Sequence, residues 1–250
     1  MISVCMAVYN GAQFIKEQMD SILPQLAPDD ELIVSDDNSD DNTLEILRQF
    51  NDTRIKIVHH IRDFSKRKNA AGYYCSNNFS NAIQMAKGDI IFLSDQDDVW
   101  YEEKVKKILK VLEKNDLCMS NFSIINENGE VLTQKYFKHN PLKHNWFSNF
   151  NKNVYFGCCM AFRKDSVKQF MPIPISIPSY DNWIGTILHL TKKKVLFIEE
   201  PLVFYRRHTM NISPATGKSK NPMWFKIFWR AQFLFNLIKH FANRSAKGED

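Results

Sequence analysis

Several features that would assign a function class are missing from this 250-residue sequence. It has no CxxC pair, and its cysteines are odd in number, so neither a zinc site nor a disulfide framework is expected. No Gly-x-Gly-x-x-Gly turn follows the first apolar segment, which excludes a dinucleotide-binding dehydrogenase. Gly217–Ser219 is not a phosphate-binding loop, because Ile212 stands where the upstream glycine is required.

Long apolar segments are also absent. No stretch reaches the roughly 18 uncharged apolar residues that a membrane-spanning helix needs. The opening residues MISVCMAVYN run into a predicted strand without a charged leader, so we expect no secretion signal. A reducing, cytoplasmic location is the expectation that follows, and Cys5 in its apolar run is expected to be a buried thiol.

Acidic residues are missing from one region in particular. Between Pro201 and Gly248 there is no Asp or Glu, whereas nine Lys and Arg occur there. The last 50 residues therefore carry a net charge of +7, and the first 200 carry −2, out of +5 for the whole chain. The basic charge belongs to the C-terminal tail, which indicates that one end of the molecule meets an anionic surface.

Strand and helix patterns alternate in the first half of the chain. Short apolar segments alternate with segments in which apolar residues recur every three or four positions. This order predicts an α/β fold with a largely parallel sheet covered by helices on both faces, and ligands bind such sheets beyond the carboxyl ends of the strands. The predicted strands are Ile2–Val8, Glu31–Ser35, Ile55–His59 and Asp89–Leu93, and the predicted helices are Phe14–Leu26, Ser39–Phe50, Asn77–Ala86 and Val105–Leu112.

The second half of the chain is less regular. Asn128-Gly129 between two apolar segments predicts a hairpin, and an aromatic-rich loop follows it. The remaining predicted elements are the hairpin strands Leu117–Ile125 and Val131–Thr133, the segment Val154–Arg163, the helix Tyr180–Leu190 and the strand Val195–Ile198.

Acidic residues gather at or just beyond predicted strand ends. Ser35–Asp41 follows the second strand, Ser94–Asp98 follows the fourth, and Asp181 stands alone. Each could be a turn or a helix cap, because Asp, Asn and Ser suit both. The second cluster is costly without a cation, however, because an apolar strand delivers three carboxylates within four residues. If the strand alternation continues, Asp95 and Asp97 lie on one side and suit Mg²⁺ or Mn²⁺ with a diphosphate ligand.

Three segments together resemble family-2 glycosyltransferases of the GT-A fold, a Rossmann-like fold. They are Ser3–Asn10, Ser35–Asn42 and Ser94–Trp100, and their order and spacing match that family over residues 1–210. The run Leu93–Trp100 and the later Tyr205–His208 are similar to bacterial rhamnosyltransferases of polysaccharide assembly.

The resemblance implies a metal-dependent hexosyltransferase that uses a nucleoside-diphosphate sugar. Residues 1–115 would form its nucleotide-sugar half and residues 116–210 its acceptor half. Asp97 would bind the metal, and Asp181 would be the catalytic base, although the family often has Glu-Asp where Tyr180 precedes Asp181 here. The positions implied to bind the nucleotide are Ala7, Tyr9, Asp37 and Asp95.

Further residues are candidates on chemical grounds. Arg206 and Arg207 are expected to bind the diphosphate, and His208 is expected to ligate the metal, unless these residues form only a basic turn after a strand. Aromatic and small residues are candidates for the acceptor side, with core packing as the open alternative for each. These candidates are Trp100, Gly157, Cys158 and Trp183.

In the tail, residues 211–250, the spacing of apolar and basic residues predicts an amphipathic helix over Pro222–Asn243. One apolar face is expected to lie on the cytoplasmic surface of a membrane, with cations opposite, which suits a lipid-linked glycan acceptor. A second apolar stripe favours the alternative that the helix packs on the domain or on a partner. The membrane face comprises Trp224, Ile227, Leu234, Phe235 and Ile238, the cations are Lys226, Arg230, His240 and Arg244, and the second stripe is Phe225, Trp229, Phe233 and Leu237.

Other functions fit the sequence less well than a glycosyltransferase. The basic residues cluster in one tail while the strand ends are acidic, so we expect no nucleic-acid partner. A nucleotidyltransferase usually has a Gly- and Arg-rich first loop, which Tyr9–Ala12 lacks. A sugar-nucleotide-binding protein without turnover, or a membrane-surface module, remains the alternative to an enzyme.

Overall fold

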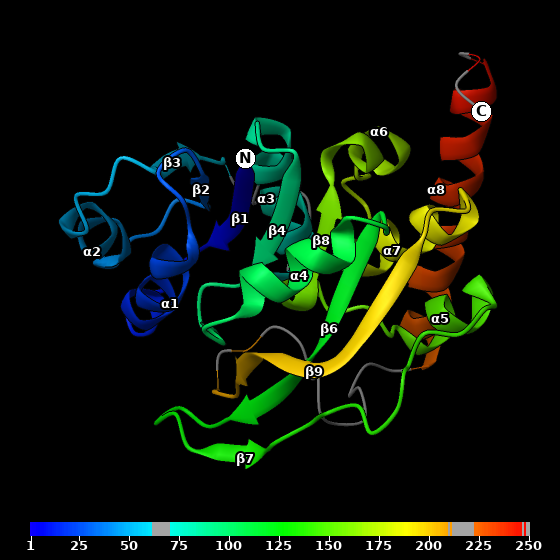
Figure 1. Ribbon diagram of the computed structural model, residues 1–250. Helices are drawn as coiled ribbons and strands as arrows, with labels where there is room; N and C mark the ends of the chain where they lie inside the picture. Colours follow the sequence, from blue (N-terminus) through cyan, green and yellow to red (C-terminus); the bar gives the residue numbers. More distant parts are fainter. Residues whose placement is uncertain (62–70, 210, 212–222, 247, 249–250) are drawn as a thin grey trace.

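The computed structural model describes residues 1–61, 71–209, 211, 223–246 and 248 (Figure 1). A single mixed sheet runs in the order β3-β2-β1-β4-β8-β6-β9-β5, with β7 paired to β6. The strands are β1 (Ile2–Val8), β2 (Glu31–Asp36), β3 (Ile55–His59), β4 (Ile90–Ser94), β5 (Val99–Trp100), β6 (Leu117–Ile125), β7 (Val131–Thr133), β8 (Met160–Arg163) and β9 (Val195–Arg206). The α-helices are α1 (Ile15–Ile22), α2 (Thr43–Gln49), α3 (Ala71–Met85), α4 (Lys104–Leu112), α5 (Trp146–Lys152), α6 (Val167–Phe170), α7 (Tyr180–Leu190) and α8 (Met223–Ala246).

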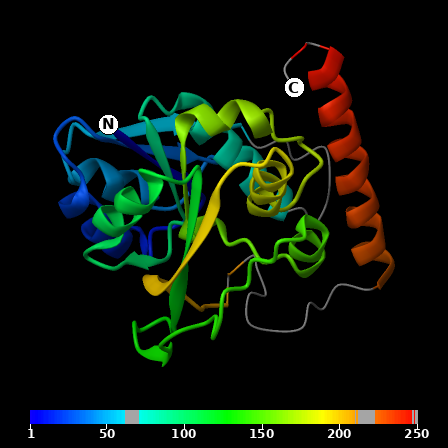
Figure 2. The ribbon, with the colours of Figure 1, turned by 45° about the vertical axis from the view of Figure 1, so that its right-hand side comes forward.

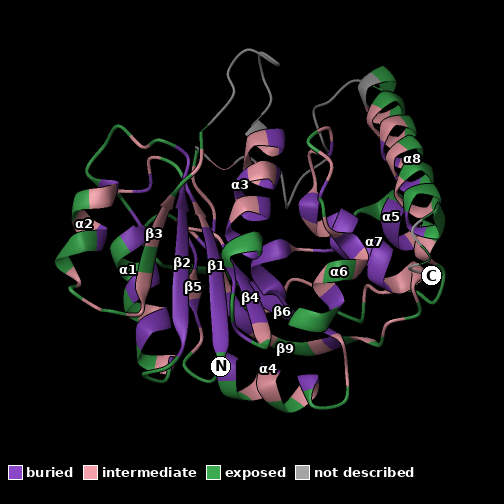
Figure 3. Ribbon diagram, turned by 90° about the horizontal axis from the view of Figure 1, so that it is seen from above, coloured by how far each residue is buried: buried purple, intermediate pink, exposed green. Residues whose placement is uncertain are grey.

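The first half of the sheet is parallel, as the sequence predicts. Strand β1 pairs in parallel with β2 and β4, and β2 pairs in parallel with β3. All six residues of β2 are buried, and its centre Leu32–Val34 is apolar, because helices cover both faces of such a strand. Helices α3 and α4 lie on opposite faces of the sheet (Figures 1 and 3). The carboxyl ends of β1, β2 and β4 therefore meet at one edge.

The second half of the sheet is mixed. Strand β8 is antiparallel to both β4 and β6, whereas β6 and β9 are parallel. The predicted hairpin at Asn128-Gly129 is confirmed by the antiparallel pairing of β6 with β7. Strand β9 is longer than predicted, because register shifts opposite Asn121 carry its pairing with β6 past Pro201 to Arg206. This extension places the end of β9 beside the acidic turn after β4.

The aromatic-rich segment contains a helix that the sequence reading missed. In α5, the side chain of Asn145 accepts a hydrogen bond from the backbone N–H of Phe147, and Asn153 ends the helix in the left-handed region at φ +48°. Asn at both ends is a recognisable helix signal, because its short polar side chain caps the first turn and tolerates positive φ.

Helix α8 lies at the edge of the molecule, alongside α5 and α7 (Figures 2 and 3). Its buried residue Phe233 contacts the rings of Phe150 and Trp183. The connection 212–222 lies outside the described residues, as does most of the basic loop before α3. Within the described chain, no helix combines the length and apolar character needed to cross a membrane.

Candidate active site

The site begins where β1 ends, at Ala7 and Tyr9. The side chain of Gln96 holds the backbone of Tyr9 from both sides: Gln96 Oε1 accepts from Tyr9 N at 2.8 Å, and Gln96 Nε2 donates to Tyr9 O at 3.0 Å. A Cβ on Gly11 would lie 2.7 Å from Gln96 Oε1, so glycine makes room for this clamp. Ala7 is half-buried and Tyr9 is exposed. The sequence does not single out Gln96, because an amide side chain between two aspartates indicates no particular role.

Asp37 stands just past the end of β2 and is buried. Its backbone N–H donates to Val8 O, and its Oδ1 lies 2.7 Å from Nδ1 of His60. The Asn78 side chain on α3 donates to Val8 O and Ser35 O, so it ties the ends of β1 and β2 together. The predicted nucleotide-binding positions Ala7, Tyr9 and Asp37 are thus brought together at one sheet edge. His60 and Asn78 are additional members of this region.

The acidic turn after β4 differs from the prediction. The strand ends at Ser94 and the chain bends, so the expected alternation of Asp95 and Asp97 does not continue. Instead, ligand atoms of Asp95, Asp98 and Cys158 lie within 4.8 Å of one another. Asp97 does not belong to that group and is paired with His208 instead. The turn therefore divides its carboxylates between two neighbouring places.

Asp97 in this turn is paired with His208, which lies just past the end of β9. His208 Nε2 lies 2.7 Å from Asp97 Oδ2, and the side chain of Asn211 lies 3.4 Å from the same oxygen. The His208 side chain is 7% exposed and that of Asp97 is 17% exposed. The predicted metal-binding residues are therefore adjacent.

Burial and repulsion perturb the other two carboxylates. Burial, and then the negative charge of Asp97, raise the pKa of Asp98 to about 7. Burial, and then the charges of Asp98, Asp97 and Asp181, raise the pKa of Asp95 well above its ordinary value. Asp98 Oδ1 accepts from the backbone N–H of Arg206, while Oδ2 has no partner among the described groups.

A buried lysine lies beneath these carboxylates. Lys104 on α4 is 0% exposed, its Nζ donates to Cys158 O at 2.8 Å, and the same nitrogen lies 3.8 Å from the ring centre of Trp100. Burial lowers the pKa of Lys104 to about 8, although Asp98 and Asp95 oppose the shift. Lys104 is a counter-charge that sequence reasoning missed, because it reads as one of several lysines on an amphipathic helix.

The pair Asp97–His208 and the group Asp95, Asp98 and Cys158 differ in how well they suit Mg²⁺ or Mn²⁺. Cys158 has a pKa well above its ordinary value, owing to its hydrogen bond with Cys159 and to burial, so its sulfur is a protonated thiol. A thiol is a poor ligand for Mg²⁺ or Mn²⁺, which prefer carboxylate oxygen, and Mn²⁺ also accepts imidazole nitrogen. Asp97 and His208 therefore fit the expected metal better than Asp95, Asp98 and Cys158 do.

Asp181 lies in the first turn of α7 and is half-buried. Ser179 Oγ donates to Asp181 Oδ1 at 2.6 Å, and the Asn182 backbone N–H donates to the same oxygen at 2.7 Å. Burial raises the pKa of Asp181, even though these hydrogen bonds and one from the Gly157 backbone lower it. Asp181 is thus a fixed carboxylate with elevated basicity, as a general base requires.

Gly157 lies beside Asp181, and a larger residue at this position would collide with Tyr180. A Cβ at this position would lie 2.0 Å from the hydroxyl oxygen of Tyr180. Gly157 and Cys158 belong to the 3₁₀ turn η2 (Gly157–Cys159), and both are buried. The thiol of Cys158 lies within 4.8 Å of carboxylate oxygens of Asp95 and Asp98, whereas Tyr180 lies against Gly157. The assignment of Gly157 and Cys158 to the acceptor stays a prediction.

The thiol of Cys75 on α3 shows how close the carboxylates are. Burial raises its pKa well above the ordinary value, and the charges of Asp95, Asp181, Asp37 and Asp97 raise it further. These four carboxylates come from the residue after β2, from the turn after β4 and from α7. The fold has therefore brought the predicted acidic residues into one region, at the end of the sheet where β1, β2 and β4 end.

Arg206 corrects one prediction. Its guanidinium is buried and donates to Glu17 Oε2, Asp97 O and Glu127 O at 2.5, 2.9 and 3.1 Å. A side chain with its donors engaged in this way is not available to a diphosphate, so Arg206 fixes the acidic turn instead. Arg207 is half-buried and its charge acts on Tyr136, and its assignment to the diphosphate stays a prediction.

The two tryptophans proposed for the acceptor are core residues. Trp100 is 3% exposed and packs on Phe92 and Lys104. Trp183 is fully buried, and its ring N–H donates to Phe170 O at 2.9 Å. Neither reaches a surface that an acceptor sugar could contact, so both assignments were wrong. The aromatic character that suggested sugar stacking serves packing here.

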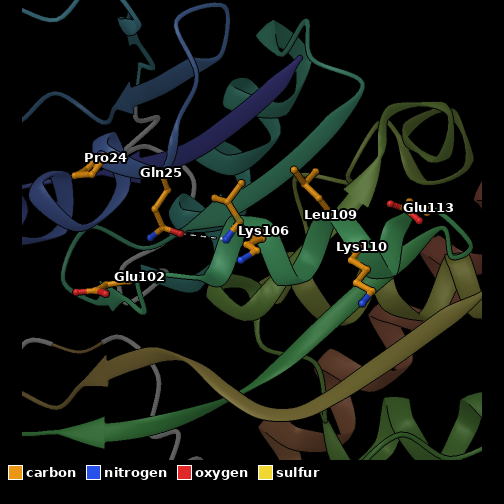
Figure 4. A pocket seen from close by; sticks show the side chains of 8 residues that line it. Pro24, Gln25, Glu102, Lys106, Leu109, Lys110 and Glu113 are labelled. Atoms are coloured by element: carbon orange, nitrogen blue, oxygen red, sulfur yellow. Dashed lines mark hydrogen bonds between the residues drawn. The ribbon is translucent and has the colours of Figure 1, made fainter.

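A groove of about 590 Å³ lies elsewhere, between α4 and the turn at Pro24 (Figure 4). Gln25 reaches across it to accept a hydrogen bond from Val105 N at 3.1 Å. Leu109 and Lys110 line its far side. None of the acidic residues described above lines this groove, so it is not the donor site.

The sequence profile of glycosyl transferase family 2 matches residues 3–171, which is more than half of the chain. The chain therefore belongs to this family of glycosyltransferases, and its fold is the GT-A fold that the motifs predict. Asp181, Arg206 and His208 lie beyond the matched segment.

Individual relatives and solved structures agree with this assignment. The chain is 28% identical to the dTDP-rhamnosyl transferase RfbG of Shigella flexneri over 82% of this chain and 72% of that protein. It is 31% identical to the Escherichia coli UDP-Glc:α-D-GlcNAc-diphosphoundecaprenol β-1,3-glucosyltransferase WfgD over 58% of this chain and 56% of that protein.

Two solved structures share the fold. S. aureus TarS in complex with UDP-GlcNAc matches at a TM-score of 0.66 and 17% identity, covering 93% of this chain and 71% of that one. The Pyrobaculum calidifontis mannosyltransferase PcManGT in complex with GDP-Man and Mn²⁺ matches at a TM-score of 0.57 and 17% identity, covering 98% and 75%.

Proposed function

We propose that this protein transfers one sugar from a nucleoside-diphosphate sugar to a hydroxyl of a growing cell-surface glycan, with inversion at the anomeric carbon. The observation that carries the proposal is the clustering of carboxylates just beyond the end of β4: the ligand atoms of Asp95, Asp98 and Cys158 lie within 4.8 Å of one another, and Asp97 Oδ2 lies 2.7 Å from His208 Nε2. The negative charges of Asp95, Asp97 and Asp98 repel one another, so their clustering is costly unless a cation and a ligand lie beside them.

Asp181 is the residue we assign to proton transfer. Its carboxylate removes the proton from the acceptor hydroxyl as that oxygen attacks the anomeric carbon from the face opposite the leaving diphosphate. Ser179 and Asn182 hold one oxygen of the carboxylate, which fixes the direction of the other. A single displacement of this kind inverts the anomeric centre.

Asp97 and His208 would hold a divalent metal, Mg²⁺ or Mn²⁺. When bound, such an ion supplies positive charge for the departing diphosphate. Arg206 keeps this pair in place, because it binds the backbone carbonyl of Asp97 and the carboxylate of Glu17 at once. We assign Ala7, Tyr9 and Asp37 to the base of the donor and Asp95 to its ribose, as the family resemblance implies.

The sugar and the acceptor are proposed from the relatives. RfbG is named for dTDP-rhamnose and supports rhamnose as the transferred sugar. WfgD is named for a diphosphoundecaprenol acceptor, which supports a lipid-linked glycan. An acceptor of this kind is held in a membrane, and we place the enzyme as a peripheral protein on its cytoplasmic face.

The test is a thermal-shift screen of nucleoside diphosphates and nucleotide sugars, each with and without Mn²⁺, followed by turnover with the donor that binds. We expect a donor whose stabilisation of the protein increases with Mn²⁺. Absence of any nucleotide-dependent shift would overturn the proposal. Binding without transfer or hydrolysis would identify a sugar-nucleotide-binding protein instead of an enzyme.

A further inference from the structure

Helix α8 has two apolar faces, and the described residues of the chain cover only one of them. On the inner face Phe233 and Leu237 are buried against the domain. The opposite face is exposed, with Trp224 69%, Phe235 67% and Ile238 71% accessible to solvent. The large apolar residues of this outer face are Trp224, Ile227, Phe228, Phe235 and Ile238. Exposed apolar patches of this kind mark interaction surfaces.

The orientation of α8 is fixed, so the outer face cannot turn inward. Arg230 donates to the side chain and the backbone carbonyl of Asn151, each at 3.0 Å. His240 Nε2 lies 2.7 Å from Gln169 O, and Arg244 donates to Lys168 O at 2.8 Å. These side chains, which the sequence assigned to lipid headgroups, bind the domain instead. Leu234 is half-buried, so it does not belong to the outer face.

The charge around the outer face indicates which kind of partner binds it. No Asp or Glu occurs between Met223 and Ala246, whereas Lys239 is exposed on the helix itself. Next to its first turns, α5 and its flanks expose Lys143, Phe147 and Lys152. A second copy of the chain would bring the same positive charge against this surface. A surface of anionic lipid has the complementary charge and accepts the apolar side chains.

We propose that the outer face of α8 docks on an anionic bilayer, with the helix lying in the plane of the interface. The 24-residue helix provides about 36 Å of contact along that plane. Large aromatic residues in its first turns, Trp224 and Phe228, suit the headgroup layer. The helix has the character of an interfacial helix and not of a spanning one.

Docking of α8 would place α7, the helix that carries the proposed base Asp181, close to the membrane surface. Trp183 lies two residues after Asp181 on α7, and its ring is 5.3 Å from that of Phe233 on the inner face of α8. The ring contact joins the helix of the proposed base to the helix that docks. This consequence rests on the proposed function, because it matters only if the acceptor is linked to a membrane lipid.

The experiment is flotation of the full chain with vesicles of phosphatidylglycerol and phosphatidylcholine, and with phosphatidylcholine alone. We expect binding to the anionic vesicles that weakens with salt. Phe235→Glu and Ile238→Glu should each lower the bound-to-free ratio at least about tenfold, because each replaces an inserted apolar side chain by a charge. Leu132→Glu on β7, where Leu132 is 61% exposed, is the matched control and should float like the wild type.

Two results would overturn docking: flotation of Phe235→Glu at the wild-type level, and no flotation of the wild type even at low salt. In the second case, a concentration-dependent dimer that Phe235→Glu dissolves would assign the face to a second copy. Metal-enhanced nucleotide binding, measured on the same variants, separates this proposal from the enzymatic one. If a variant that does not float still shows metal-enhanced nucleotide binding, the proposed function is unaffected by the loss of docking.

Discussion

His208 Nε2 lies 2.7 Å from Asp97 Oδ2, although 111 residues separate the two in the chain. Each is fixed by a separate part of the fold, Asp97 by the turn after β4 and His208 by the residues just past β9. We assign this pair of one carboxylate and one imidazole to the proposed divalent cation.

Removing either partner should abolish metal-enhanced donor binding. We expect Asp97→Ala and His208→Ala to stay folded and to lose the additional thermal stabilisation that Mn²⁺ gives in the presence of a nucleotide. Glu103→Ala is the matched control, because Glu103 is exposed and lies outside the site. Retention of full Mn²⁺-dependent stabilisation by both site variants would rule out this pair as the metal site.

Asp181→Asn should separate binding from chemistry. The amide keeps the shape of the carboxylate but cannot accept a proton, so we expect unchanged donor affinity and a transfer rate lower by about 100-fold or more. Steady-state kinetics and donor titration on the same preparation check both parts. A variant that transfers sugar at the normal rate would show that another residue is the base.

The pH dependence of transfer should report the environment of Asp181. Burial raises its pKa, and only the deprotonated carboxylate can act as a base. We therefore expect kcat/KM to fall as the pH is lowered, with a midpoint above the ordinary value for aspartic acid of about 3.9. A pH–rate profile on the metal-loaded enzyme measures this, and a midpoint at or below the ordinary value would contradict the assignment.

Asp98 should make the metal-free protein less stable as the pH rises. Its pKa in the folded protein is about 7, compared with 3.8 ordinarily, so the folded state binds more protons between those values. The stabilisation that the proton provides is complete below the ordinary pKa and is lost as the pH rises through about 7. Urea unfolding across this window should show the decline, and Asp98→Asn should flatten it. Identical slopes for the two proteins would exclude Asp98 as the cause.

Lys104→Met should destabilise the protein much more than the same change at an exposed lysine on the same helix. The substitution leaves Asp95 and Asp98 without their buried counter-charge, and breaking such a buried pair costs about 3 kcal/mol or more. Lys106→Met, where the side chain is 82% exposed, should change the free energy of unfolding by less than about 0.5 kcal/mol. Urea denaturation compares the two.

Partial recovery in the double variant Lys104→Met, Asp98→Asn would confirm that charge compensation is the reason. If Lys104→Met unfolded at the same urea concentration as Lys106→Met, the ammonium group would have no such role.

The sequence alone determined the parallel half of the sheet, because its strands are short apolar segments between amphipathic helices. It also determined the site's neighbourhood, since the residues that follow parallel strands meet at one sheet edge. Asp37, Asp95 and Asp97 were therefore found from local patterns. The family motifs added Asp181, which periodicity alone does not single out.

Tertiary structure decided which side chains are available to a ligand. Arg206 reads as a phosphate-binding residue, yet the extension of β9 buries it against Glu17 and the backbone of Asp97. Trp183 reads as a sugar-binding residue, yet α8 covers it. Both outcomes depend on contacts between segments far apart in the chain, and no local pattern contains them. The exposed face of α8 was settled in the same way: the sequence provides two apolar stripes, and packing on α5 and α7 determines which one remains outside.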